Sequence, residues 1–267
     1  MQGRLLPPVG NHIQAFPEMQ WKDEFVTAKE CGLDIIEWIF EGSDWQSNPI
    51  LSNPEAIVAA TDLHGVRVVS VIADFFMDLP LLRASKGELK ERLTVFNSLI
   101  DQASRIGIKY INVPFVDNSE IRNAIEVQEV VRVFSEVLPE AEKRSIFLAL
   151  ETSLDPEKFE KLLRSIDHPN VKVNYDIGNS AALGYNPAEE MDAYGKSIAT
   201  VHVKDRVKGG KTVPLGEGNA DFVTVFSRLG EIGYDGPVVL QAARNGDEVP
   251  AIKGYMEFVR GYLEKYF

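Results

Sequence analysis

The sequence predicts a single α/β domain over residues 1–267, a (β/α)8 barrel in which eight parallel strands alternate with helices. The first observation behind this prediction is a repeated rhythm of helix end, glycine and short β-branched run, at Gly32, Gly65, Gly107 and Gly233. Glycine readily adopts the left-handed conformation that ends a helix. The runs after these glycines lack strict alternation, as expected of parallel strands buried on both faces.

Helix starts provide the second observation. An Asn or Asp precedes a proline at Asn53, Asp155 and Asn186, and this pair is typical of a helix N-terminus. The third observation is the number of alternating elements, because parallel strands require crossover helices. Strands are expected near residues 1–5, 34–39, 66–73, 109–115, 146–151, 171–176, 198–203 and 237–241. Helices are expected between and after them, the longest near residues 85–106 and 119–143.

An open, doubly wound sheet is the alternative fold. The motif G-x-G-x-x-G does not follow the first strand, and G-x-x-x-x-G-K-[ST] occurs nowhere, which argues against that alternative. The first strand of the barrel is short, because it would have to begin at or near Met1. Either the barrel tolerates a short first strand, or the natural chain starts a few residues earlier.

The composition argues against several kinds of partner. A formal net charge of −12 at pH 7 disfavours nucleic acid and anionic membrane surfaces, which attract basic proteins. No apolar stretch is long enough to span a bilayer, and the first residues lack the apolar run of a signal peptide. Cys31 is the only cysteine, so no disulfide can form within the chain and a reducing, cytoplasmic location is expected. A homo-oligomer is left open.

Polar side chains end four consecutive predicted strands. Glu151 follows five apolar residues, Asp176 ends the next strand, and His202 and Gln241 end the last two. In a (β/α)8 barrel the C-terminal ends of the strands carry the chemistry. An oxygen-rich set with one imidazole suits one divalent ion, Mn²⁺, Mg²⁺, Co²⁺ or Zn²⁺, in an open site. Taken singly, each residue also has a structural interpretation: the carboxylates can cap loops, the histidine can be a hydrogen-bonded structural residue, and the glutamine can bond to the backbone.

Seven short motifs follow one another along nearly the whole chain. They are Gln2–Leu5, Ile36–Trp38, Val113–Phe115, Ala149–Glu151, Asp176–Asn179, Val201–Asp205 and Pro214–Gly218. In their order and spacing the sequence resembles the sugar-phosphate isomerase/epimerase family with the xylose-isomerase-like TIM barrel. The resemblance implies that Glu151, Asp176 and His202 are metal ligands. The fourth ligand of that family is usually a glutamate at the end of strand eight, where this sequence has Gln241.

The glutamine at position 241 affects the chemistry that the resemblance implies. In the similar epimerases, two strand-end glutamates act as paired bases on opposite faces of the substrate, and inversion needs a base on one face and an acid on the other. Gln241 cannot exchange a proton, although its carbonyl oxygen can still bind a metal. The metal site is therefore expected to persist. Epimerisation by two glutamates is left open, with a one-base reaction on Glu151 as another route.

Five further residues are predicted to contact the substrate. Glu37 and Trp38 end the second strand, where the carboxylate can bond to sugar hydroxyls and the indole can form the pocket floor; packing at the rim is the alternative. Lys204 and Arg206 belong to a basic cluster after strand seven, where barrels often bind phosphate, and a solvated loop is the alternative. Arg244 lies just past strand eight and can clamp an anionic end of the substrate.

The residues and the resemblance together predict a divalent-metal-dependent isomerase or epimerase of a sugar, a sugar phosphate or a related polyol ketone. The metal would bind two vicinal substrate oxygens and stabilise an enediolate, while Glu151 moves the proton beside the carbonyl. Asp74, which ends strand three, is expected in the pocket wall. Alternatives are a metal-dependent lyase or dehydratase, and a non-catalytic sugar-binding barrel. A DNA-repair nuclease on this barrel would want more than four histidines and a basic face.

Overall fold

A computed structural model describes residues 3–10, 12–42 and 45–267 of the chain. Seven parallel strands form one sheet in the order β1-β2-β3-β4-β5-β6-β9. They are β1 (Ile35–Ile39), β2 (Arg67–Ile72), β3 (Tyr110–Phe115), β4 (Phe147–Thr152), β5 (Val171–Asp176), β6 (Ile198–Val203) and β9 (Val238–Leu240). The first and last of these strands contact each other, so the sheet closes into a nearly complete barrel. This sequential order confirms the barrel, because strand order reverses in a doubly wound sheet.

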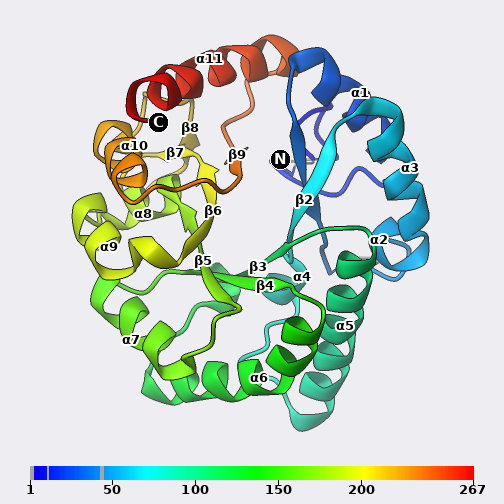
Figure 1. Ribbon diagram of the computed structural model, residues 1–267, viewed down its shortest axis with the longest axis vertical. Helices are drawn as coiled ribbons and strands as arrows, with labels where there is room; N and C mark the ends of the chain where they lie inside the picture. Colours follow the sequence, from blue (N-terminus) through cyan, green and yellow to red (C-terminus); the bar gives the residue numbers. More distant parts are fainter. Residues whose placement is uncertain (1–2, 11, 43–44) are drawn as a thin grey trace.

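Helices surround the barrel, as Figure 1 shows. They are α1 (Trp21–Cys31), α2 (Pro49–Ser52), α3 (Pro54–His64), α4 (Phe75–Asp78), α5 (Lys86–Arg105), α6 (Ala124–Lys143), α7 (Pro156–Ile166), α8 (Ile177–Leu183), α9 (Pro187–Tyr194), α10 (Phe222–Glu231) and α11 (Glu248–Tyr266). None of them, over the described ranges, combines the length and hydropathy that a membrane span needs. A short antiparallel hairpin, β7 (Asp205–Arg206) with β8 (Thr212–Val213), follows β6.

The local signals in the sequence explain where helices begin and end. Each of the four glycines in the predicted rhythm has a positive φ, between 68° and 82°, as a left-handed helix end requires. The side chains of Asp155 and Asn186 accept hydrogen bonds from the first turns of α7 and α9. Asn53 differs, because α3 begins at Pro54 as predicted but the Asn53 side chain makes no capping bond.

Over its described residues, the segment predicted as the first strand is not a strand. Residues 3–6 form turns and bends, and residues 1 and 2 lie outside the described part of the chain. The Gly3 amide donates to Glu24 Oε1 at 2.7 Å, and Arg244 donates to the carbonyl oxygens of Gly3 and Leu6. Side chains therefore satisfy backbone groups that a neighbouring strand would otherwise pair. Gly3 also has a φ of 73°, a left-handed conformation that does not fit an extended strand.

Candidate metal and catalytic site

Three buried side chains from consecutive strands meet where those strands end. Glu151 of β4, Asp176 of β5 and His202 of β6 each offer a ligand atom within 4.8 Å of the other two. His202 Nδ1 lies 3.7 Å from Glu151 Oε2 and 3.9 Å from Asp176 Oδ2. The register of the parallel strands pairs Asp176 with His202, which explains why the two side chains are neighbours. Two carboxylates and an imidazole at this spacing could bind a divalent metal ion.

The ring of His202 is oriented from its opposite nitrogen. Nε2 lies 2.7 Å from Glu37 Oε2, and both side chains are fully buried. A carboxylate behind the imidazole, with the other nitrogen directed at the ligand position, is the usual support of a metal-binding histidine. Burial alone would lower the pKa of His202, but the charge of Glu37 and the hydrogen bond to it raise that pKa above its ordinary value. The arrangement of the ring thus fits a metal site.

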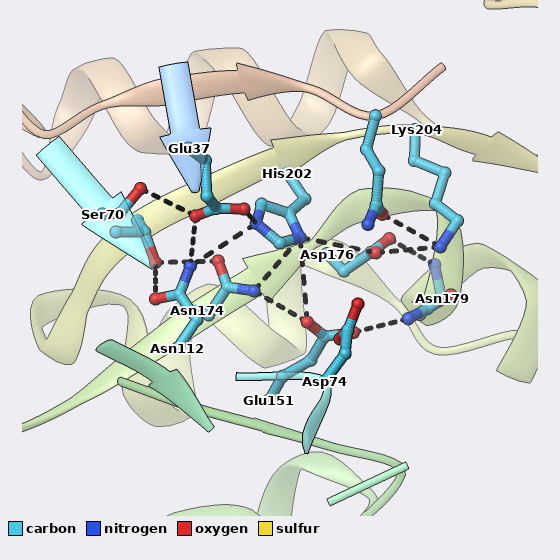
Figure 2. A network of polar contacts seen from close by, with 12 residues as sticks. Glu37, Ser70, Asp74, Asn112, Glu151, Asn174, Asp176, Asn179, His202 and Lys204 are labelled. Atoms are coloured by element: carbon cyan, nitrogen blue, oxygen red, sulfur yellow. Dashed lines mark hydrogen bonds and ion pairs between the residues drawn. The ribbon is translucent and has the colours of Figure 1, made fainter. Parts of the chain in front are cut away.

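A layer of small polar side chains holds these groups inside the barrel, as Figure 2 shows. Glu37 Oε1 accepts hydrogen bonds from Ser70 Oγ at 2.8 Å and from Asn112 Nδ2 at 2.6 Å. The Thr200 hydroxyl lies 2.9 Å from Asn112 Oδ1 and 2.7 Å from Asn174 Oδ1. All five side chains are at most 2% exposed. Because these groups bond to one another, the orientation of the histidine is set before any ligand arrives.

Both carboxylates divide their oxygens between separate partners. Glu151 Oε1 accepts from Asn179 Nδ2 at 2.6 Å, and Oε2 accepts from Asn174 Nδ2 at 2.7 Å. Asp176 Oδ1 caps α8 by accepting a hydrogen bond from the backbone N–H of Asn179 at 2.8 Å, while Oδ2 faces His202. The capping role is thus compatible with a role in the site. Burial, followed by the charge of Asp176, raises the pKa of Glu151.

Lys204 connects Gln241 to the three-residue group. Its Nζ lies 3.2 Å from Asp176 Oδ2 and donates to Gln241 Oε1 at 3.0 Å. Gln241 directly follows β9, and its amide continues the sheet by donating to the Val203 carbonyl at 2.9 Å. The glutamine therefore lies beside the three-residue group. Its role as a fourth metal ligand stays a prediction.

Glu37 and Trp38 do not face a substrate. Both side chains are 0% exposed. Glu37 points into the barrel toward His202. The Nε1–H group of Trp38 donates a hydrogen bond to Asn48 Oδ1 at 2.9 Å. The Trp38 ring also packs against Trp21 of α1, with ring centroids 5.3 Å apart. The prediction that they bind substrate is corrected, because successive residues of a strand point to opposite sides and neither side here meets an open surface.

The two arginines predicted to bind an anion are engaged by the protein itself. Arg206 Nη1 donates to Asn179 Oδ1 at 2.8 Å, and its other nitrogens donate to the Gly210 carbonyl. Arg244 donates to backbone carbonyls of the N-terminal segment, residues 3–10 and 12–16, and forms an ion pair with Glu248 at 2.7 Å. The role of the two arginines in binding an anionic substrate stays a prediction. Arg206 supports the amide that holds Glu151, and Arg244 holds the N-terminal segment in place.

A cavity of about 990 Å³ lies beside the site. Asp74, which follows β2, lines it together with Gln14 of the N-terminal loop, and this confirms Asp74 as pocket wall. Gln14 Nε2 donates to Asp74 Oδ2 at 3.3 Å, and Gln14 Oε1 accepts from Gln241 Nε2 at 3.4 Å. Burial and then the charge of Glu151 raise the pKa of Asp74 to about 7. The cavity wall is thus coupled to the site by contact and by charge.

Several site residues were missed by reasoning from the sequence. Asn112 and Asn174 interrupt apolar strands, and that interruption was a usable signal for an inward polar position. Asn179 stands three residues after Asp176, where a loop or cap residue is unremarkable. Gln14 lies in a loop without regular structure, so no pattern indicated that it reaches the site.

The fold is an α/β barrel with a buried Glu-Asp-His group at its strand ends. The comparison with known families identifies the class of barrel. Residues 25–262 match the family described as the xylose isomerase-like TIM barrel, and the chain belongs to it. The L-ribulose-5-phosphate 3-epimerase UlaE of Salmonella heidelberg (strain SL476) is 28% identical over 260 residues, which cover 91% of this chain and 90% of the relative. The UlaE protein of Escherichia coli (strain K12 / DH10B) is 29% identical over 264 residues, with the same coverage. The chain is therefore an isomerase- or epimerase-like enzyme.

Solved structures show the same fold. A xylose isomerase domain protein from Planctomyces limnophilus superposes with a TM-score of 0.77 at 18% identity, covering 97% of this chain and 95% of that one. The IOLI protein, whose structure was solved with a binding zinc atom, also has a TM-score of 0.77, at 20% identity and with 93% and 94% coverage.

Proposed function

We propose that this protein is a divalent-metal-dependent epimerase or isomerase of a ketose sugar or a related polyol ketone. The observation that carries the proposal is the meeting of Glu151, Asp176 and His202 within 4.8 Å at the strand ends. The relatives named as L-ribulose-5-phosphate 3-epimerases support it, because they match over almost the whole chain.

Glu151, Asp176 and His202 would hold the ion, with Gln241 as a fourth oxygen ligand if its amide turns away from Lys204. The zinc in the IOLI structure supports a metal on this scaffold. When bound, the ion would polarise the substrate carbonyl and the neighbouring hydroxyl and so favour an enediolate. The polar side chains of the pocket wall, among them Asp74 and Gln14, suit a substrate rich in hydroxyl groups.

Glu151 would move the proton on the carbon beside the carbonyl. Asn174 and Asn179 fix both of its oxygens, so the carboxylate approaches one face of that carbon in one orientation. Gln241 cannot serve as the base on the opposite face. Solvent exchange in D₂O should therefore be faster at one face of the carbon than at the other. Equal exchange at both faces would reveal a second base.

Replacement of the two carboxylates by amides separates their roles. Glu151→Gln should lower turnover by at least about a thousandfold while the far-UV circular dichroism stays unchanged, because the amide cannot accept the proton. Asp176→Asn should instead weaken Mn²⁺ affinity in calorimetry, and excess Mn²⁺ should restore part of the turnover. Undiminished turnover by Glu151→Gln would show that another residue is the base. Products of unchanged mass distinguish an isomerase or epimerase from a dehydratase.

A further inference from the structure

The charged side chains that line the cavity beside the site are acidic. Among the described residues that line it are four carboxylates, Glu18, Glu41, Asp74 and Asp78, and no lysine or arginine. The remaining polar lining consists mainly of amides and hydroxyls, together with one histidine. The residues outside the described part of the chain are Met, Gln, Asn, Ser and Asp, so they add no basic side chain either.

Basic side chains near the site are already bonded to the protein. Arg4, 7% exposed, donates to Gln14 Oε1 at 2.8 Å and to the Ala242 carbonyl at 2.6 Å. Lys204 bonds to Asp176 and Gln241. Arg206 and Arg244 are held by an amide, a carboxylate and backbone carbonyls, as described above.

The exposed lysines of the β7–β8 hairpin do not complete an anion site in this cavity. Lys208 and Lys211 are exposed but do not line the cavity. A phosphate group there would bring about −1.5 to −2 charges next to carboxylates, with no free guanidinium or ammonium group to balance them. Sugar hydroxyls, in contrast, donate hydrogen bonds that carboxylate oxygens accept.

Building on the proposed function, we infer that the substrate is an unphosphorylated sugar or polyol ketone and that the acidic cavity wall discriminates against sugar phosphates. Glu41 accepts from the Phe16 amide at 3.0 Å and Asp78 from the Gly42 amide at 2.9 Å, so these carboxylates hold the loops around the cavity in place. These two carboxylates are therefore held at fixed positions on the wall. The names of the UlaE relatives, in contrast, specify a phosphorylated pentulose.

Matched substrate pairs test the inference. The Mn²⁺-loaded enzyme is assayed with L-ribulose and L-ribulose 5-phosphate, D-fructose and D-fructose 6-phosphate, and D-tagatose and D-tagatose 6-phosphate. We expect kcat/KM to be at least about tenfold higher for the unphosphorylated member of any pair that is turned over. A higher kcat/KM for the phosphorylated member would overturn the inference and leave the proposed function intact.

Binding provides a readout that does not depend on turnover. Calorimetry with Glu151→Gln should detect the unphosphorylated sugar and not its phosphate. If no pair is turned over, the proposed function fails, and the binding comparison still decides the inference. Tighter binding of the phosphate, or binding of neither member, overturns it.

A charge variant of the wall identifies the cause. Glu18→Gln combined with Asp78→Asn should narrow the ratio of kcat/KM between the two members of a pair by at least about threefold. The control is Asp62→Asn combined with Glu91→Gln, two exposed carboxylates on α3 and α5 that change the net charge equally. An equal narrowing by the control, or none by the wall variant, would contradict the role assigned to the wall.

Discussion

Asn174 and Asn179 determine how Glu151 presents its carboxylate. Each amide donates to one oxygen, at 2.7 and 2.6 Å, so the carboxylate cannot rotate without breaking a buried hydrogen bond. Arg206 in turn donates to the oxygen of the Asn179 amide at 2.8 Å and keeps that amide from flipping. The carboxylate proposed to transfer the proton is thus oriented by residues from two other segments of the chain.

Lys204 should oppose metal binding, because its ammonium group lies beside the proposed metal ligands. The Nζ atom is 3.2 Å from Asp176 Oδ2, and like charges repel strongly in a site that excludes water. Lys204→Met should therefore lower the Kd for Mn²⁺ by about tenfold or more in calorimetry at pH 7.5. Lys208→Met, which removes an exposed charge from the following loop, is the control and should change little. Weaker binding by Lys204→Met would mean that the lysine organises the ligands.

Glu24 should make stability depend on pH. It is 0% exposed, and burial raises its pKa to about 7, although the amides of Gly3 and Leu5 donate to it. Since this pKa exceeds the ordinary 4.5, the stabilising contribution is fully present below about pH 4.5 and is lost as pH rises through 7. The difference corresponds to about 3 kcal/mol at most.

Glu24→Gln stays neutral, so it should gain stability relative to the wild type between pH 5 and pH 8. Urea unfolding of both proteins at the two pH values measures the gain. Glu55→Gln, at an exposed carboxylate on α3, should show no such trend. A constant difference between Glu24→Gln and the wild type would place the protonation change elsewhere.

Among the elements, the N-terminal segment is the least regular and the most dependent on side chains. It occupies the gap that a first strand would fill, yet Glu24 and Arg244 bind its backbone from α1 and from the loop after β9. The hairpin β7–β8 shows the same principle, since the Asp205 carboxylate accepts hydrogen bonds from the amides of Gly216, Gly218 and Ala220. Buried ionic side chains here replace regular backbone pairing.

Arg244→Met should release the N-terminal segment. The change removes donors to three backbone carbonyls and leaves Glu248 without this partner. We expect a loss of about 2–4 kcal/mol in the free energy of unfolding. Limited proteolysis should find new cleavage within residues 3–16. Arg132→Met, which breaks an exposed ion pair with Glu136 on α6, should cost less than about 1 kcal/mol and expose no new site. Unchanged cleavage in Arg244→Met would show that other contacts hold the segment.

The whole molecule brings distant parts of the chain to one end of the barrel. Glu151 belongs to β4, Asp74 and Gln241 follow the ends of β2 and β9, and Gln14 comes from a loop. They surround one site because parallel strands all end at the same edge. The whole molecule also carries the net charge of −12. The net charge affects which partners the protein attracts or repels, and it does not determine the fold.

Nucleic acid should not bind to this protein. An acidic surface repels phosphate backbones, and low salt exaggerates any electrostatic binding that exists. A mobility-shift assay with duplex and single-stranded DNA at about 20 mM salt is therefore the severe test, and we expect no shift at micromolar protein concentrations. A clear shift at this ionic strength would favour a nuclease function on the same barrel.

Local patterns in the sequence determined the elements and the three-residue group. The glycines after helices, the Asp155 and Asn186 caps and the buried apolar runs act within a few residues, so they can be interpreted without the fold. Once a barrel is expected, polar residues at strand ends must lie near one another, so the sequence predicts that Glu151, Asp176 and His202 meet.

Only the tertiary structure decided where individual side chains point and what they bind. Whether Glu37 faces a substrate or a histidine depends on neighbouring strands, and Arg244 clamps Gly3 across 241 residues of sequence. The irregular conformation of residues 3–6 has the same origin, because their backbone partners are the side chains of Glu24 and Arg244 from other elements. Hydrogen-bond partners so far apart leave no local trace in the sequence, whereas turns, caps and apolar runs arise from neighbouring residues and therefore do.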